Sequence, residues 1–63
     1  MVETTRLLYS VVEAAQGLGI GRSLMYELIA AGELGSVKIG RRTLVPHDEL
    51  VRYVARLRED VAA

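Results

Sequence analysis

The sequence contains no cysteine, and this absence excludes several kinds of protein. With no cysteine among 63 residues, the chain can form neither a disulfide framework nor a thiolate metal site. A domain of this size must therefore be held together by packing alone. Because a chain of about 60 residues buries only about 60% of its unfolded surface, we expect residues 1–63 to form a single domain.

Long apolar runs are also missing. No apolar stretch approaches the roughly 20 residues of a membrane-spanning helix, and residues 1–6 lack the basic start and apolar run of a signal peptide. The expected location is therefore the cytoplasm, with no membrane partner.

Residues suited to catalysis are scarce. The chain has one histidine, His47, and the adjacent acids Asp48 and Glu49 would not face each other on a helix. The glycines at positions 17, 19 and 21 do not match a dinucleotide-binding loop, because they follow a predicted helix and not a strand. We therefore expect no enzyme, no metal site and no cofactor.

The most informative stretch is residues 10–32, which predicts a helix, a tight turn and a second helix. Ala15 is small where two steeply crossing helices leave little room, Gly19 can adopt positive φ in the turn, and Met25 and Leu28 are placed to face inward. This spacing is typical of a helix-turn-helix and favours a nucleic-acid-binding module.

A capping box predicts the start of the first helix. The Ser10 hydroxyl can accept from the Glu13 backbone N–H, while the Glu13 carboxylate accepts from the Ser10 N–H. The helix is expected over residues 11–16 and is expected to end at Gly17. Ile20 should plug the turn, and residues 7–9 predict a short edge strand. The inward residues are expected to be Val11, Ala14, Ala15 and Leu18.

The second helix is expected over residues 22–31, with Gly32 as a left-handed cap. Its periodicity separates an inward and an outward face. An exposed aromatic such as Tyr26 favours a DNA partner over a merely solvated face, and Arg22 is the stronger candidate for a guanine contact. The inward residues are Leu24, Met25, Leu28 and Ile29, and the outward residues are Arg22, Ser23, Tyr26, Glu27 and Ala30.

Residues 36–45 predict a β-hairpin around Gly40 and Arg41. The length of its loop stays open, because the two possible registers exchange which of Arg42 and Thr43 faces outward. In either register the apolar residues Val37 and Ile39 are expected to face the core.

The charge of the chain is uneven although it sums to zero. Eight Lys and Arg residues balance eight Asp and Glu residues, which taken alone argues against a nucleic-acid partner. However, Lys38, Arg41 and Arg42 cluster with no acid between Ser36 and Pro46. A basic hairpin tip of this kind could contact phosphate.

A third helix is expected over residues 47–60. We expect Asp48 to pair with Arg52 on its outer face, and its apolar stripe to pack on the other two helices. With that stripe buried, the protein should be a monomer in free solution. The stripe comprises Leu50, Val54, Leu57 and Val61, flanked by Val51 and Tyr53.

Residues 9–54 resemble the phage excisionase family, whose members are small winged helix-turn-helix domains of mainly α structure with a β-hairpin wing, related to the MerR DNA-binding head. The most specific matches are the capped start at residues 10–15, the turn at 18–20, Met25-Tyr26 with Leu28-Ile29, the exit at 32–34 and residues 38–42 before Pro46. The chain departs from the family at Gly21, where serine or threonine is usual, and at Gly35, where proline is frequent.

The resemblance implies that the second helix enters the major groove of double-stranded DNA and that the wing follows the minor groove. Carried onto this chain, the helix residues are Gly21, Arg22, Ser23, Tyr26 and Glu27, and the wing residues are Lys38, Gly40, Arg41, Arg42 and Thr43. It further implies repeated sites, further copies of the protein on DNA, DNA bending, and a phage integrase that is turned toward excision. The protein would then be associated with the nucleoid.

Two other functions fit the same residues. A small MerR-like transcription regulator would share the fold, because a fold does not fix a function. A protein-interaction module without DNA binding would suit the neutral net charge.

Overall fold

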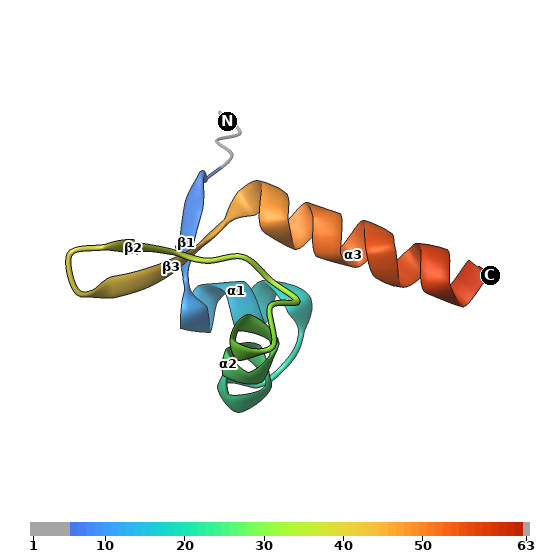
Figure 1. Ribbon diagram of the computed structural model, residues 1–63, viewed down its shortest axis with the longest axis horizontal. Helices are drawn as coiled ribbons and strands as arrows, with labels where there is room; N and C mark the ends of the chain where they lie inside the picture. Colours follow the sequence, from blue (N-terminus) through green and yellow to red (C-terminus); the bar gives the residue numbers. More distant parts are fainter. Residues whose placement is uncertain (1–5, 63) are drawn as a thin grey trace.

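The computed structural model describes residues 6–62 and has the three helices and the hairpin that the sequence predicts (Figure 1). It is a mainly helical winged helix-turn-helix, as expected. The elements in chain order are β1 (Leu8–Ser10), α1 (Val11–Leu18), α2 (Arg22–Ala30), β2 (Val37–Ile39), β3 (Arg42–Pro46) and α3 (His47–Ala62).

The wing, which we define as the β2–β3 hairpin, belongs to a three-stranded antiparallel sheet in the order β1-β3-β2. Ile39 pairs with Arg42, so the loop consists of two residues, Gly40 and Arg41. Gly40 has a φ of 62°, and positive φ at the first loop residue alone is the sign pattern of a type II′ hairpin turn. The loop length that the sequence left open is therefore two residues.

The expectation that Val37 and Ile39 face the core is wrong. Both side chains are exposed, Ile39 to 58%. Val37 lies opposite Leu44, and directly opposed residues share a face of the sheet. The next residue, Val45, points to the other face and is fully buried. The hairpin thus contributes to the core through Val45, and not through the apolar residues of β2.

The start of α1 is the predicted capping box. The Ser10 Oγ accepts from the Glu13 N–H at 3.1 Å, and the Glu13 carboxylate accepts from the Ser10 N–H at 3.0 Å. The predicted end at Gly17 is wrong, because the helix continues to Leu18. The left-handed residue is Gly19, with a φ of 75°, and it is this glycine that turns the chain.

The helix α2 has no side-chain cap at its start, where Gly21 stands. Its end is a Schellman motif centred on the predicted Gly32, whose φ is 80°. The Gly32 N–H donates to Ile29 and the Glu33 N–H donates to Leu28. Leu24 is 45% exposed, so its predicted inward position is wrong.

One small core holds the two helices of the helix-turn-helix against β3. Ala15 is almost fully buried, as the crossing requires, and Ile20 packs against the core at the turn. The buried residues are Val11, Ala14, Ala15, Met25, Leu34 and Val45. The partly buried residues packed on them are Tyr9, Leu18, Ile20, Leu28, Ile29, Leu50 and Tyr53.

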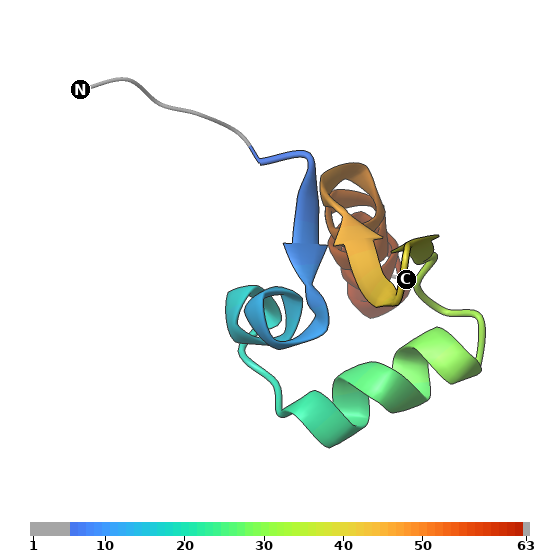
Figure 2. The ribbon, with the colours of Figure 1, turned by 90° about the vertical axis from the view of Figure 1, so that its left-hand side faces the viewer.

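The helix α3 extends away from this core (Figure 1), and Figure 2 shows it nearly end-on. Leu50 and Tyr53 pack on the core, but Val51, Val54 and Leu57 are exposed, Val51 to 56%. The predicted burial of the whole stripe on the other helices is therefore wrong, and with it the premise from which a monomer was inferred. The side chain of Val61 lies outside the described part. An apolar groove of about 480 Å³ runs between α1 and α3, lined among others by Leu18, Leu50, Val51 and Val54.

Polar contacts fix α3 to the loop after α2. The Gly35 N–H donates to the Glu49 carboxylate at 2.9 Å, and Arg56 pairs with Glu33 at 2.8 Å. A proline at position 35 would have no N–H for the first contact. A Cβ added at Gly35 would come within 2.9 Å of the Glu49 Cδ, so the same contact favours glycine here. The predicted pairing of Asp48 with Arg52 is wrong, because Arg52 instead contacts Glu49 at 3.5 Å.

Low pH is expected to reduce the stability that the N-terminal cap of α1 contributes to the fold. Arg6 binds the Glu13 carboxylate at 2.8 Å, and this hydrogen bond, with that from the Ser10 N–H, lowers the pKa of Glu13 from 4.5 to about 2. A lowered folded-state pKa stabilises the fold above pH 4.5, and this contribution is lost as the pH falls through about 2. We expect Glu13→Gln to melt below the wild type at pH 7 in thermal circular dichroism.

The difference in Tm between the two proteins should shrink as the pH falls from 5 to 2. Using this difference removes the effect of the other carboxylates, which titrate in both proteins. A difference that stays constant over this range would show that the Glu13 charge does not stabilise α1.

Candidate nucleic-acid interface

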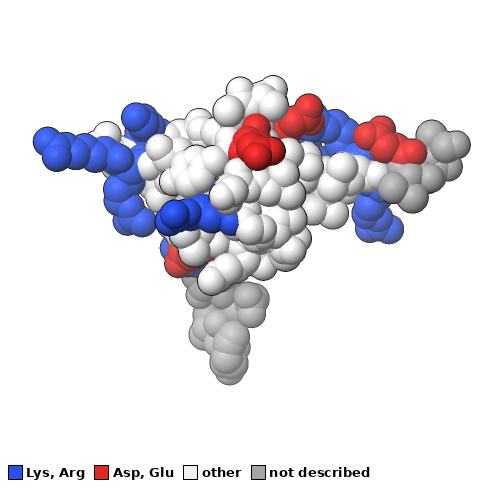
Figure 3. Space-filling view, turned by 90° about the horizontal axis from the view of Figure 1, so that it is seen from below, with Lys and Arg blue, Asp and Glu red and all other residues white. Residues whose placement is uncertain are grey.

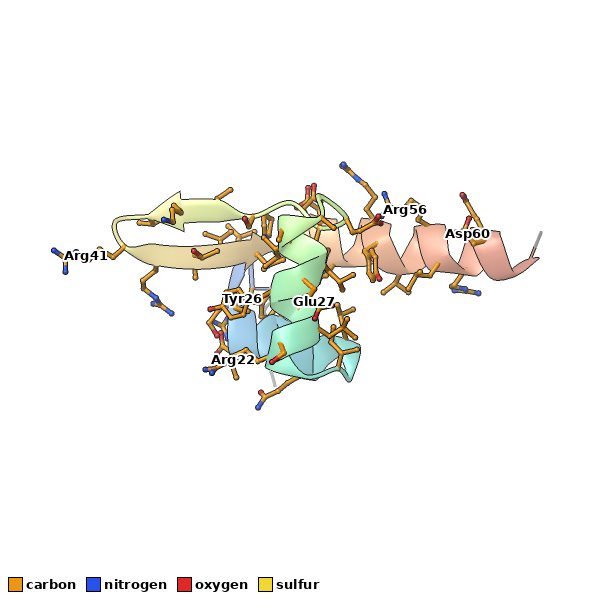
Figure 4. All side chains as sticks on the ribbon, turned by 60° about the horizontal axis from the view of Figure 1, so that its bottom comes forward. Arg22, Tyr26, Glu27, Arg41, Arg56 and Asp60 are labelled. Carbon is orange, nitrogen blue, oxygen red and sulfur yellow. The ribbon has the colours of Figure 1, made fainter. Side chains whose placement is uncertain are left out.

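A groove separates α2 from the wing. It has a volume of about 250 Å³ and is lined by residues of α2, the wing and the start of α1, which are Ser10, Val11, Val12, Arg22, Tyr26, Arg41, Arg42 and Thr43. Figure 4 shows that Arg22 and Tyr26 lie on the side of α2 that faces the wing, that Arg41 lies at the wing tip, and that Glu27 does not point into this gap. We call this feature the α2–wing groove.

The arginines of the α2–wing groove form no ion pair with the acidic residues of the described part of the chain. Within residues 6–62, the ion pairs join Arg6 to Glu13, Arg52 to Glu49 and Arg56 to Glu33. Among residues 6–62, no acidic side chain lines the groove, and the wing end of the face in Figure 3 presents Lys and Arg atoms without Asp or Glu atoms. The zero net charge of the chain therefore conceals a basic surface. Glu13, Glu49 and Glu33 form ion pairs at α1 and α3, away from this surface.

The predicted site residues are accessible to solvent, and half of them line the α2–wing groove. All ten are exposed except Thr43, which is half-buried. Five of them line the groove: Arg22, Tyr26, Arg41, Arg42 and Thr43. The helix residues Gly21, Ser23 and Glu27 and the wing residues Lys38 and Gly40 lie outside its lining. Whether any of them binds DNA stays a prediction.

Three other residues that line the groove carry no functional signal in the sequence. Ser10, Val11 and Val12 belong to the capped start of α1, and their sequence roles are capping and packing. They reach the groove because Ser10 lies opposite Leu44 in the sheet, beside the wing residues Arg42 and Thr43. The start of α1 and the wing are therefore brought together by pairing between strands that lie more than 30 residues apart in the chain, which local sequence patterns do not predict.

This architecture, two crossing helices with a basic wing beside the second, defines a helix-turn-helix protein, a class whose second helix contacts DNA. Residues 8–58 match the helix-turn-helix domain family, and the chain belongs to that family. The class is one of DNA-binding domains and not of enzymes.

A more particular likeness comes from a curated relative. The chain is 48% identical over 52 residues to a probable excisionase of Saccharopolyspora erythraea. This confirms the resemblance to excisionases that the sequence showed. The match covers 82% of this chain and 53% of the relative, so the chain spans about half the length of that protein. No solved structure matches the chain.

Two searches of the described residues were negative. No helix within residues 6–62 is long and apolar enough to cross a membrane. In the same part of the chain, no group of three or more His, Asp or Glu side chains is arranged to hold a metal ion.

Proposed function

We propose that the protein binds double-stranded DNA as an excisionase-type architectural factor. The observation that carries this proposal is the basic α2–wing groove, where Arg22, Arg41 and Arg42 converge and no acidic residue from 6–62 joins them. In this arrangement α2 lies in the major groove and the wing follows the adjacent backbone into the minor groove. The likeness to a probable excisionase supports the same assignment.

The size of the domain implies that it acts in several copies. A single module of this kind buries only about 600–1,000 Å² on DNA and contacts a few base pairs, which is too little to select one site among millions. Neighbouring copies on repeated sites multiply the contacts and raise the effective concentration. Successive wings placed in the minor groove would bend the duplex.

The proposed biological output is the direction of recombination. A curved array of copies brings separated integrase sites together and thereby favours excision over integration. We infer a phage integrase as the partner of the assembled complex, and the nucleoid as the place where the protein acts.

A recombination assay tests this function. The protein is added to a phage integrase and its attachment sites, and excision and integration are measured separately. We expect excision to be stimulated and integration to be suppressed. If neither rate changes while the protein still binds DNA in an electrophoretic shift, a transcription regulator is the better assignment. If no duplex is shifted at low salt, the fold serves protein interaction.

A further inference from the structure

We propose that the α2–wing groove holds a phosphate of the DNA backbone, and that Glu27 and not Arg22 contacts a base. The inference rests on the proposed DNA binding and assigns separate tasks to two neighbouring rows of α2. It differs from the expectation drawn from the sequence, in which Arg22 contacts guanine.

The geometry of α2 separates the two rows. Met25 is fully buried and marks the side of the helix that faces the core. At about 100° per residue, Ser23 and Glu27 lie two positions on either side of Met25 and therefore about 160° from it, on the side turned away from the protein. Arg22 and Tyr26 form the adjacent row, and both line the groove toward the wing.

The position of each row determines what it meets on DNA. A helix that enters the major groove presents its outermost row to the base edges. The row that faces the wing lies instead against the sugar-phosphate backbone of the DNA strand that separates the major groove from the minor groove. Arg22 and Tyr26 are on that second row, together with Arg42 across the gap.

The side chains of the groove have the chemistry of a phosphate site. Guanidinium groups bind phosphate oxygens through paired N–H donors, and the hydroxyls of Tyr26 and the half-buried Thr43 can donate further hydrogen bonds. The Ser10 hydroxyl accepts from the Glu13 N–H, which leaves its own proton free to donate. Val11 and Val12 add an apolar wall against which a deoxyribose can pack.

The charge of Glu27 supports the same division. Glu27 is exposed, and within residues 6–62 no cation pairs with it. A carboxylate would be repelled by a backbone phosphate, but over the base edges it can accept from the N4 amino group of cytosine. Glu27 is therefore suited to contact base edges in the major groove and unsuited to contact the phosphate backbone beside it.

The experiment compares Arg22→Ala with Glu27→Gln. A duplex site is first selected from a randomised library with the wild-type protein, and the affinity of each protein is then measured on that site and on its single-base-pair variants at several salt concentrations. The matched control is Arg58→Ala, which removes one positive charge far from the groove. Circular dichroism establishes that each variant is folded.

We expect Arg22→Ala to weaken binding by a similar factor on every sequence, and to lower the slope of log K against log salt by about one unit. Glu27→Gln should keep the slope and abolish a preference for cytosine at one base pair, a discrimination of roughly 5- to 150-fold. Arg58→Ala should leave the slope and the preferences unchanged.

Three results would overturn the proposal. Loss of a guanine preference at one position in Arg22→Ala, with an unchanged salt slope, would make Arg22 the base-contacting residue. Unchanged preferences in Glu27→Gln would remove Glu27 from the interface with bases. In both cases the wild type still binds DNA, so the proposed function stands. If the wild type selects no duplex at all, the proposed function itself fails.

Discussion

Removing the three cations of the wing, in the variant Lys38→Ala/Arg41→Ala/Arg42→Ala, is expected to weaken DNA binding by a factor on the order of 10²–10³ at 0.1 M salt. Each phosphate contact releases condensed counterions and contributes about 0.9 to the slope of log K against log salt. Loss of three contacts should therefore lower the slope by about 2.7 units. The loss should be similar for all sequences, because phosphate contacts carry no base information.

The control for this variant is Arg52→Ala/Arg56→Ala/Arg58→Ala on α3, which lowers the net charge by the same amount. Arg52 and Arg56 already pair with Glu49 and Glu33, and all three lie outside the α2–wing groove. We expect this variant to keep most of the affinity and most of the salt slope. Equal losses in the two triple variants would mean that net charge, and not the wing, determines binding.

Met25→Ala is expected to lower the free energy of unfolding by about 2–5 kcal/mol. Met25 is fully buried and is the largest side chain of α2 in the core. A domain of this length, at about 0.05–0.15 kcal/mol per residue, has a total stability of only about 3–9 kcal/mol. Urea unfolding followed by circular dichroism should therefore show a greatly lowered midpoint, or no folded baseline at all.

The matched control is Leu24→Ala, the preceding residue of the same helix. Leu24 is 45% exposed, so truncating it should cost much less than truncating Met25, although the two side chains have similar size. A loss as large as that of Met25→Ala would show that Leu24 is buried in solution. Such a loss would also support the inward position that the periodicity of α2 predicts for Leu24.

Local chemistry determined much of this protein from the sequence alone. The Ser10–Glu13 capping box, the left-handed glycine after α2 and the order of helices, turn and hairpin depend on residues within a few positions of one another, and the structure confirms them. The burial of Ala15 and Met25 was equally predictable, because two crossing helices of a small domain need one small and one large apolar residue at fixed spacing. The basic tip of the wing was visible as a charge cluster.

Only the tertiary structure decided which apolar side chains face the core and which distant residues lie side by side. Val37, Ile39 and Leu24 have apolar side chains that periodicity placed inside, but the pairing of Val37 with Leu44 and the single buried row of α2 leave them exposed. The distal part of the apolar stripe of α3 is exposed because Leu50 and Tyr53, in the first half of the helix, make its apolar contacts with the core.

The α2–wing groove is likewise a feature that only the tertiary structure creates. It exists because β1 pairs with β3 and so brings the start of α1 beside the wing and α2. Pairing between strands distant in the chain depends on the packing of the whole domain, whereas caps and turns depend on adjacent residues. The sequence therefore determined which residues are basic, apolar or turn-forming, and only the packed fold decided which of them share a surface.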